Sequence, residues 1–309
     1  LEDSRNWEVE ESQSSKNSLV SYTSIVFKEQ NMKGVKHVQK TLASSALLYG
    51  QGLHSGKKSG LTLEPLPPNS GIHFCGVSDK VAVPAHIDWV HSTGFATTLK
   101  LGKTQAGTIE HIMSALNAFG ISNLLIKCNG EVPVMDGSSL EFCNLFKDIG
   151  VIEQDGEWYD IKIDKEIKVG DEKEWIKVEP ADGFIIDYTL SYPEPIGTQH
   201  YVYELNSPDS YIKEISPART FGFVRDIGAL QKQGLALGGR FDNFVLLGTD
   251  GPINTSLRFD NECVRHKVLD AIGDLYLLGR RIRGKVTASM TGHSDNIALL
   301  ALLNEELKK

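Results

Sequence analysis

The stretch TIEHIMSALNAFG (Thr108–Gly120) contains the clearest helix signal in the first half of the sequence. Its apolar residues recur at spacings of three and four, as they do on one face of an amphipathic helix. They are Ile109, Ile112, Met113, Leu116 and Phe119. Gly120 predicts the end of the helix, because glycine readily adopts the left-handed conformation that closes helices. The sequence therefore predicts a helix from Thr108 to Phe119.

Short strands are expected on both sides of this helix. The alternating sequence GLTLEP (Gly60–Pro65) predicts a half-buried strand that ends at a proline-rich turn. A second helix is predicted from about Ser138 to Asp148. The other expected strands of the first half begin at Val35 or lie at Gly71–Cys75, Lys80–Pro84, Ala96–Leu99 and Leu124–Cys128.

The second half of the sequence repeats this rhythm of strands and helices. Its predicted strands are Asp160–Val169, Glu174–Val178, Phe184–Leu190 and Lys285–Ser289. Its predicted helices are Asp226–Gln233, Asn261–Leu278, which Gly279 closes, and Ser294–Leu307. Strands occur in runs and do not alternate singly with helices, which favours an α+β fold over a doubly wound parallel sheet. We predict two α+β domains, residues 35–153 and 154–309, with a boundary near Ile152–Trp158, after a flexible tail of residues 1–34.

Composition narrows the class of protein. The chain has 309 residues, 40% of them apolar, and a net charge of −8, which argues against a general binder of nucleic-acid backbones. Its four cysteines are widely spaced, so we expect buried reduced thiols and neither a thiolate zinc site nor a disulfide framework. No apolar run approaches the roughly 20 residues of a membrane span. We expect a cytoplasmic, monomeric protein that binds no nucleic acid, and contact with a membrane surface is left open.

Two motifs have the spacing of metal ligands. In HKVLD, His266 and Asp270 stand four residues apart, so on a helix they offer a nitrogen and an oxygen to one ion. In TIEHI, His111 is a candidate third ligand and Glu110 beside it a candidate base. The alternative for the HxxxD motif is a surface pair or a simple His–Asp hydrogen bond.

Three further positions carry candidate chemistry. Asp274 lies one turn beyond Asp270 on an apolar helix, where a carboxylate is either exposed or partnered by a cation. His293 follows Gly292 at a turn between a strand and a helix, a common place for functional side chains. The glycines around His54 either bring backbone N–H groups near a phosphate or only form a tight turn.

Several long motifs follow one another along the chain. They are QKTL (Gln39–Leu42), GQGLHSGKKSGLTLEP (Gly50–Pro65), TIEHIMSAL (Thr108–Leu116), VPVMDGSS (Val132–Ser139), ARTFGFVRDI (Ala218–Ile227), GLALGGRFDN (Gly234–Asn243), LRFDNECVRHKVLDAIGDLYLLG (Leu257–Gly279) and TGH (Thr291–His293). Together, and in this order, these segments closely resemble the UDP-3-O-acyl-N-acetylglucosamine deacetylases, from about Val38 to Leu303. The resemblance implies a two-domain α+β sandwich with helices packed between the sheets, and a zinc-dependent amidohydrolase of lipid A biosynthesis.

The resemblance also implies roles for individual residues. The metal ligands correspond to His111, His266 and Asp270, with Zn²⁺ expected and Fe²⁺ an alternative at a two-His, one-carboxylate site. Among the catalytic residues, Glu110 corresponds to the general base, and His293, paired with Asp274, to the acid or electrostatic stabiliser. Lys267 is expected to supply positive charge, and Thr220 to donate a hydrogen bond to the oxyanion.

Residues that face the substrate are expected in the second half of the chain. For the apolar side chains among them, ordinary packing in the hydrophobic core is the alternative. They are Phe221, Ile227, Leu235, Ala236 and Phe241. Arg240 departs from the family pattern beside them, as do Met290, Thr291 and the SDN segment after His293. The acyl-chain preference is therefore open.

Three rival functions remain at this stage. One is an amidohydrolase that acts on a different N-acyl sugar. Another is a degenerate scaffold that binds a nucleotide sugar, which the intact set of candidate catalytic residues argues against. A third is a module fused to a dehydratase.

Overall fold

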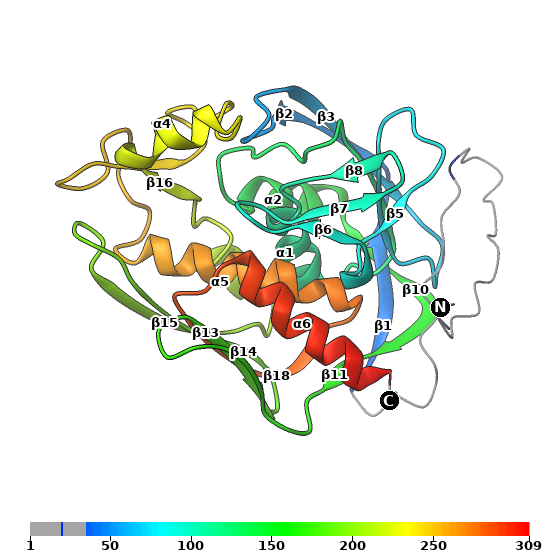
Figure 1. Ribbon diagram of the computed structural model, residues 1–309. Coiled ribbons are helices and arrows are strands. Elements are labelled where there is room, and N and C mark those ends of the chain that lie inside the picture. The colour runs from blue at the N-terminus through cyan, green and yellow to red at the C-terminus, as the bar shows by residue number, and fades with distance from the viewer. Residues whose placement is uncertain (1–19, 21–34, 309) are drawn as a thin grey trace, which may run out of the picture.

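The computed structural model describes Val20 and residues 35–308, which form two α+β halves (Figure 1). The main hydrophobic core runs through both halves, so they pack as one body. The predicted tail of residues 1–34 lies outside the described residues, apart from Val20. That valine packs with Leu66, Cys75, Ala82 and Leu125 in a separate small cluster.

The first half contains a five-stranded mixed sheet in the order β2-β3-β9-β4-β5. Its strands are β2 (Ala46–Gln51), β3 (Lys58–Pro65), β9 (Leu124–Lys127), β4 (Ile72–Cys75) and β5 (Val83–Pro84). The alternation predicted in Gly60–Pro65 is confirmed, because Leu61 and Leu63 are buried in the main core while Thr62 between them is only partly buried. A three-stranded sheet, β6 (Val90–Ser92), β7 (Thr98–Leu101) and β8 (Thr104–Ala106), lies beside it and follows the short 3₁₀ helix η2 (Ile87–Trp89).

The second half contains a larger sheet in the order β12-β13-β18-β14-β15, with β11 paired to β18. Strand β18 is central and pairs in parallel with β14 and antiparallel with β13. The strands are β11 (Ile161–Lys162), β12 (Ile167–Gly170), β13 (Trp175–Glu179), β14 (Phe184–Ser191), β15 (Thr198–Glu204) and β18 (Ile282–Ser289). A short parallel pair, β16 (Phe221–Phe223) and β17 (Val245–Leu247), stands apart from this sheet.

Helices α1 (Glu110–Phe119) and α5 (Glu262–Leu275) pack against each other between the two sheets (Figure 1). All ten residues of α1 are buried, as its central place requires, and Gly120 closes it in the left-handed conformation as predicted. The two helices approach very closely at Gly273, where a β-carbon would lie 2.0 Å from the carbonyl oxygen of Glu110. Only glycine fits there, and this contact brings the start of α1 against the last turn of α5.

The remaining helices lie around this central pair. They are α2 (Leu140–Ile149), α3 (Pro208–Glu214), α4 (Val224–Lys232), the 3₁₀ helix η3 (Tyr276–Leu278) and α6 (His293–Leu307). The predicted helices at Ser138–Asp148, Asp226–Gln233 and Ser294–Leu307 are thus confirmed to within two residues at each end, as expected for helix ends. Among the described residues, none of the helices combines the length and apolar character that a bilayer crossing requires.

Some elements differ from the sequence-based prediction. The single strand predicted at Asp160–Val169 is two strands, because the chain leaves β18 after Lys162 and joins β13 from Ile167. The segment near Ile152–Trp158 lies in β10 (Val151–Tyr159), which pairs with β1 (Lys36–Leu42), and the domain boundary there stays a prediction. Helix α3 and several short strands were not predicted.

Candidate active site

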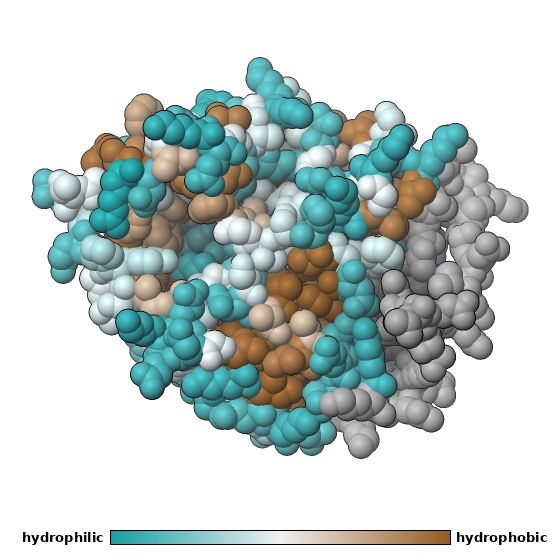
Figure 2. Space-filling view, viewed as in Figure 1, coloured by the Kyte–Doolittle hydropathy of each residue, from teal (hydrophilic) through white to brown (hydrophobic). Residues whose placement is uncertain are grey.

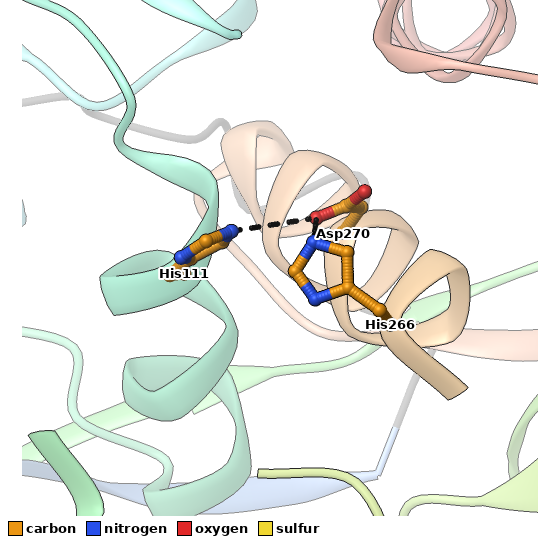
Figure 3. Close-up of side chains that lie close together, drawn as sticks. All are labelled: His111, His266 and Asp270. Atoms are coloured by element: carbon orange, nitrogen blue, oxygen red, sulfur yellow. Dashed lines mark ion pairs between the residues drawn. The ribbon is translucent and has the colours of Figure 1, made fainter. Parts of the chain in front are cut away.

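His111, His266 and Asp270 converge between the two central helices (Figure 3). Their candidate ligand atoms all lie within 4.8 Å of one another, and all three side chains are buried. His111 comes from α1, whereas His266 and Asp270 lie one turn apart on α5, as their spacing predicted. Asp270 Oδ1 is 3.3 Å from His266 Nε2 and 3.8 Å from His111 Nε2. The surface-pair alternative for the HxxxD motif is therefore wrong.

The chemistry of these three side chains fits a divalent metal ion. The Nδ1 of His266 lies 3.0 Å from the Ala218 carbonyl oxygen, so Nδ1–H donates there and the lone pair of Nε2 faces Asp270. Burial lowers the pKa of His266 and lowers that of His111 to about 3, which keeps both rings neutral and able to bind a metal. Asp270 Oδ1 is buried and accepts no hydrogen bond from the described residues. A buried carboxylate oxygen without a donor is costly, and a cation removes that cost.

Lys267 supports the second oxygen of the Asp270 carboxylate. Its Nζ lies 3.4 Å from Asp270 Oδ2, and the side chain is largely buried. Burial opposes the charge of both groups, but the two charges stabilise each other. The pKa of Lys267 is consequently raised and that of Asp270 is held well below its ordinary value. Lys267 thus keeps Asp270 ionised and leaves Oδ1 for a metal.

Glu110, His293 and Asp274 form a second group beside the three candidate ligands. His293 Nδ1 donates to Asp274 Oδ2 over 2.8 Å, and His293 Nε2 lies 3.9 Å from Glu110 Oε1. Burial raises the pKa of Glu110 to about 7. Burial alone would lower the pKa of His293, but the charges of Asp274 and Glu110 outweigh it and raise the value to about 9. A carboxylate that accepts protons near neutral pH thus faces an imidazolium.

Asp274 is fully buried, which settles whether this carboxylate is exposed or partnered. It accepts hydrogen bonds from His293 and from two residues that sequence reasoning did not single out. Thr97 Oγ1 donates to Oδ1 over 2.6 Å, and Asn296 Nδ2 donates to Oδ2 over 2.9 Å. Asn296 stands in the SDN segment after His293, but no spacing rule connects either residue to Asp274.

The loop around His54 is a tight turn held by Glu131. The backbone N–H groups of His54 and Ser55 each donate to the Glu131 carboxylate over 2.8 Å. Gly52 allows this approach, because a β-carbon there would lie 2.2 Å from Glu131 Oε2. These donors are already satisfied, so the structure favours the turn over the phosphate-binding alternative.

The positions expected to face the substrate lie around β16 and α4. The Phe221 ring is centred 6.3 Å from that of His266, which places it beside the candidate metal ligands. Thr220 directly precedes it. None of the apolar candidates Ile227, Leu235, Ala236 and Phe241 is buried, and Phe241 is 74% exposed, which argues against core packing. Figure 2 shows apolar surface gathered over this region, where the exposed hydrophobic side chains are Val224, Leu237, Phe241 and Ile253.

Arg219 anchors the segment that carries Ala218, Thr220 and Phe221. Its guanidinium donates to Glu262 Oε1 over 2.8 Å and to Oε2 over 3.1 Å, and both side chains are buried. Further bonds reach Thr255 Oγ1 and the Ser256 carbonyl oxygen. This bidentate pair ties the chain just before β16 to the first turn of α5.

Arg219→Met is expected to lower the free energy of unfolding by about 3–5 kcal/mol, because it leaves the Glu262 carboxylate buried without its partner. Urea denaturation of the two proteins measures the difference. Arg225→Met is the matched control, since Arg225 is exposed and its contact with Asp226 spans 3.9 Å. Equal stability of Arg219→Met and the unmodified chain would contradict the anchoring role.

Comparison with known proteins gives one consistent result. The family model described as LpxC: UDP-3-O-acyl N-acetylglycosamine deacetylase matches residues 39–305. A protein of Neisseria gonorrhoeae named UDP-3-O-acyl-N-acetylglucosamine deacetylase is 40% identical over 281 residues, which cover 87% of this chain and 91% of the relative. Proteins of the same name from Histophilus somni and Idiomarina loihiensis are each 42% identical, over 275 and 272 residues. These alignments cover 86% of this chain and 90% and 89% of the respective relatives.

Proposed function

This chain belongs to the UDP-3-O-acyl-N-acetylglucosamine deacetylase family, and we propose that it acts with a divalent metal ion held by His111, His266 and Asp270. The enzyme hydrolyses the acetamide of UDP-3-O-acyl-N-acetylglucosamine, a step of lipid A biosynthesis. The observation that supports the metal most directly is the convergence of three buried ligand atoms within 4.8 Å. Glu110 and His293 lie beside them in positions suited to proton transfer.

The proposed reaction adds water to the acetyl carbonyl carbon and breaks the C–N bond to give acetate and a free amine. When bound, Zn²⁺ supplies a Lewis acid that polarises the carbonyl and makes water more acidic. Glu110 takes a proton from the attacking water through Oε1, since Oε2 is held by the backbone N–H of Thr97 at 3.1 Å. The raised pKa of Glu110 suits this step, because the protonated acid forms readily.

The leaving amine needs a proton, and His293 is the group we propose to supply it. Its cation is stabilised by the Asp274 carboxylate at 2.8 Å, and its Nε2 faces Glu110. Lys267 holds Asp270 and adds positive charge near the oxyanion that develops on the carbonyl. The Thr220 hydroxyl is the proposed further donor to that oxyanion.

Zinc is our proposal for the native metal, because two imidazoles and one carboxylate with an open position are typical of catalytic zinc sites. Iron(II) is the alternative at the same donor set. Metal analysis of the purified enzyme, paired with deacetylation assays after reconstitution with each ion, tests this. We expect about one zinc ion per chain and deacetylation by the zinc-reconstituted enzyme. Activity with iron alone would overturn the assignment.

The substrate assignment is tested by comparing UDP-3-O-acyl-N-acetylglucosamine with UDP-N-acetylglucosamine that lacks the acyl chain. We propose that the exposed apolar side chains Leu237, Phe241 and Ile253 contribute to acyl recognition. Turnover should therefore fall strongly when the acyl chain is absent. Equal turnover of both compounds would favour the rival function, an amidohydrolase of another N-acyl sugar.

The activity is expected to decline as the pH rises above about 9, because His293 then loses the proton that it donates. Because its pKa is raised, His293 stays cationic up to about pH 9 and becomes neutral above that pH. Asp274→Asn removes the stabilising negative charge and should move the falling limb of kcat/KM to lower pH. A limb that stays in place in this variant would contradict the role of the Asp274–His293 pair.

A monomeric active unit stays our proposal from the sequence. Sedimentation at assay concentration tests this, and a purely dimeric active enzyme would oppose it. A cytoplasmic location stays a prediction from the sequence.

A further inference from the structure

Asp274 is held in one orientation by three donors from two parts of the fold, helix α6 and the loop before β7. His293 Nδ1 and Asn296 Nδ2, both on α6, share Oδ2 at 2.8 and 2.9 Å. Thr97 Oγ1, from the loop before β7 in the first half of the chain, takes Oδ1 at 2.6 Å. A carboxylate without such restraints turns about its Cβ–Cγ bond, and the direction of its lone pairs then changes. Here each oxygen has fixed partners, so Oδ2 stays aimed at the imidazole.

Thr97 is connected in the same way to the start of α1. Its backbone N–H donates to Glu110 Oε2 over 3.1 Å, and its carbonyl oxygen accepts from the N–H of Ile109 over 3.4 Å. The residue is fully buried. One threonine therefore contacts both the candidate base and the carboxylate that orients the candidate acid.

We infer that Thr97 and Asn296 are positioning residues of the deacetylation, and that Thr97 fixes Glu110 and the Asp274–His293 pair relative to each other. The inference rests on the proposed function, because it assigns an effect on the same reaction. Neither residue touches the substrate in this scheme. The Thr97 hydroxyl and the Asn296 side chain act through Asp274, which keeps His293 Nδ1 engaged and Nε2 directed toward Glu110.

The charged groups around His293 make its orientation sensitive to this support. Asp274 and Asp270 face it from α5, Glu110 from α1 and His54 from the loop after β2. A ring that loses its bond to Asp274 has other carboxylates to turn toward, and Nε2 then leaves the position needed to protonate the amine. Small displacements of a reacting group cost one to two orders of magnitude in rate.

Thr97→Val tests the inference, because valine keeps the shape and the backbone N–H but removes the hydroxyl. In the metal-loaded enzyme we expect kcat to fall about 10–100-fold with little change in KM or metal content. Thr97→Ser restores the hydroxyl and should recover kcat to within about threefold of the unmodified enzyme.

Thr98→Val is the matched control, since Thr98 is the buried neighbour and its hydroxyl forms no hydrogen bond with Glu110 or Asp274. A loss in Thr98→Val equal to that in Thr97→Val would overturn the inference.

A double-mutant cycle with His293→Gln separates positioning from general damage. If Thr97 acts through Asp274 and His293, Thr97→Val should lower kcat by less than about twofold in the His293→Gln background. The same fold loss in both backgrounds would overturn the inference. Asn296→Ala in the same cycle provides a second variant, should Thr97→Val fold poorly.

A spectroscopic measurement distinguishes failure of this inference from failure of the proposed function. The His293 Nδ1 proton bonded to Asp274 should give a downfield proton resonance in the metal-loaded protein, identified by its loss in His293→Gln. This resonance should broaden or vanish in Thr97→Val and persist in Thr97→Ser. An unchanged resonance in Thr97→Val overturns the positioning role, whether or not the protein deacetylates the acylated UDP-sugar.

Discussion

Glu110→Gln is expected to lower kcat for deacetylation by about 10²–10⁴-fold while the metal content stays at the level of the unmodified enzyme. Glutamine has the same shape and still accepts the hydrogen bond from Thr97 N–H, but it has no carboxylate to take a proton from water. Glu110 is the only acidic residue of α1 (Glu110–Phe119), so no other carboxylate of that helix replaces it. Steady-state assays with the acylated UDP-sugar and metal analysis of the same samples provide the measurement.

Glu141→Gln is the matched control for this prediction. Glu141 occupies the first turn of α2, as Glu110 occupies that of α1, but it is not among the groups that surround the three candidate ligands. Its replacement should leave kcat within about twofold. Normal turnover of Glu110→Gln would refute the role as base, and loss of the metal in that variant would show that Glu110 acts on the metal site.

Much of the fold follows from hydrophobic periodicity. The two central helices were predictable because their apolar residues recur at helical spacing. Gly120 closes α1 in the left-handed conformation, and Gly279 closes η3, the 3₁₀ helix that continues α5, in the same way. Strand β10 was missed because its sequence, VIEQDGEWY, does not alternate between apolar and polar residues, and all but one of its side chains are exposed or only partly buried. Backbone pairing with β1 holds this strand in place, and such pairing leaves no pattern of alternation in the sequence.

The candidate site was predictable to the extent that its residues are close in sequence or belong to family motifs. His266 and Asp270 share one helical turn, and Glu110 and His111 are neighbours. Thr97 and Asn296 were not predictable, because they meet Asp274 only after three distant segments pack together. Local spacing contains no information on such contacts, and an isolated threonine has many structural roles.

The positions of the candidate ligands imply that metal binding stabilises the fold. His111 lies on α1 and the other two ligands on α5, so an ion bound to all three cross-links the central helices. In the absence of an ion, Asp270 Oδ1 is a buried acceptor without a donor among the described residues, which destabilises the packed state. A metal that binds only the folded protein stabilises it by about 2.7 kcal/mol at a free concentration 100 times its Kd.

His266→Ala is therefore expected to abolish both activity and metal-dependent stabilisation. Loss of an outer-shell partner lowers metal affinity about 10–100-fold, and loss of a direct ligand should exceed that. In the unmodified enzyme, saturating zinc should raise Tm by about 5–10 °C over the chelated form, whereas His266→Ala should show almost no difference. Differential scanning calorimetry with zinc and with a chelator measures both.

His200→Ala is the control, because His200 is exposed and pairs with Asp187 away from the site, so it should retain the full zinc response. A zinc-dependent rise in Tm that survives in His266→Ala would place the ion elsewhere and would remove the basis for the catalytic roles of Glu110 and His293.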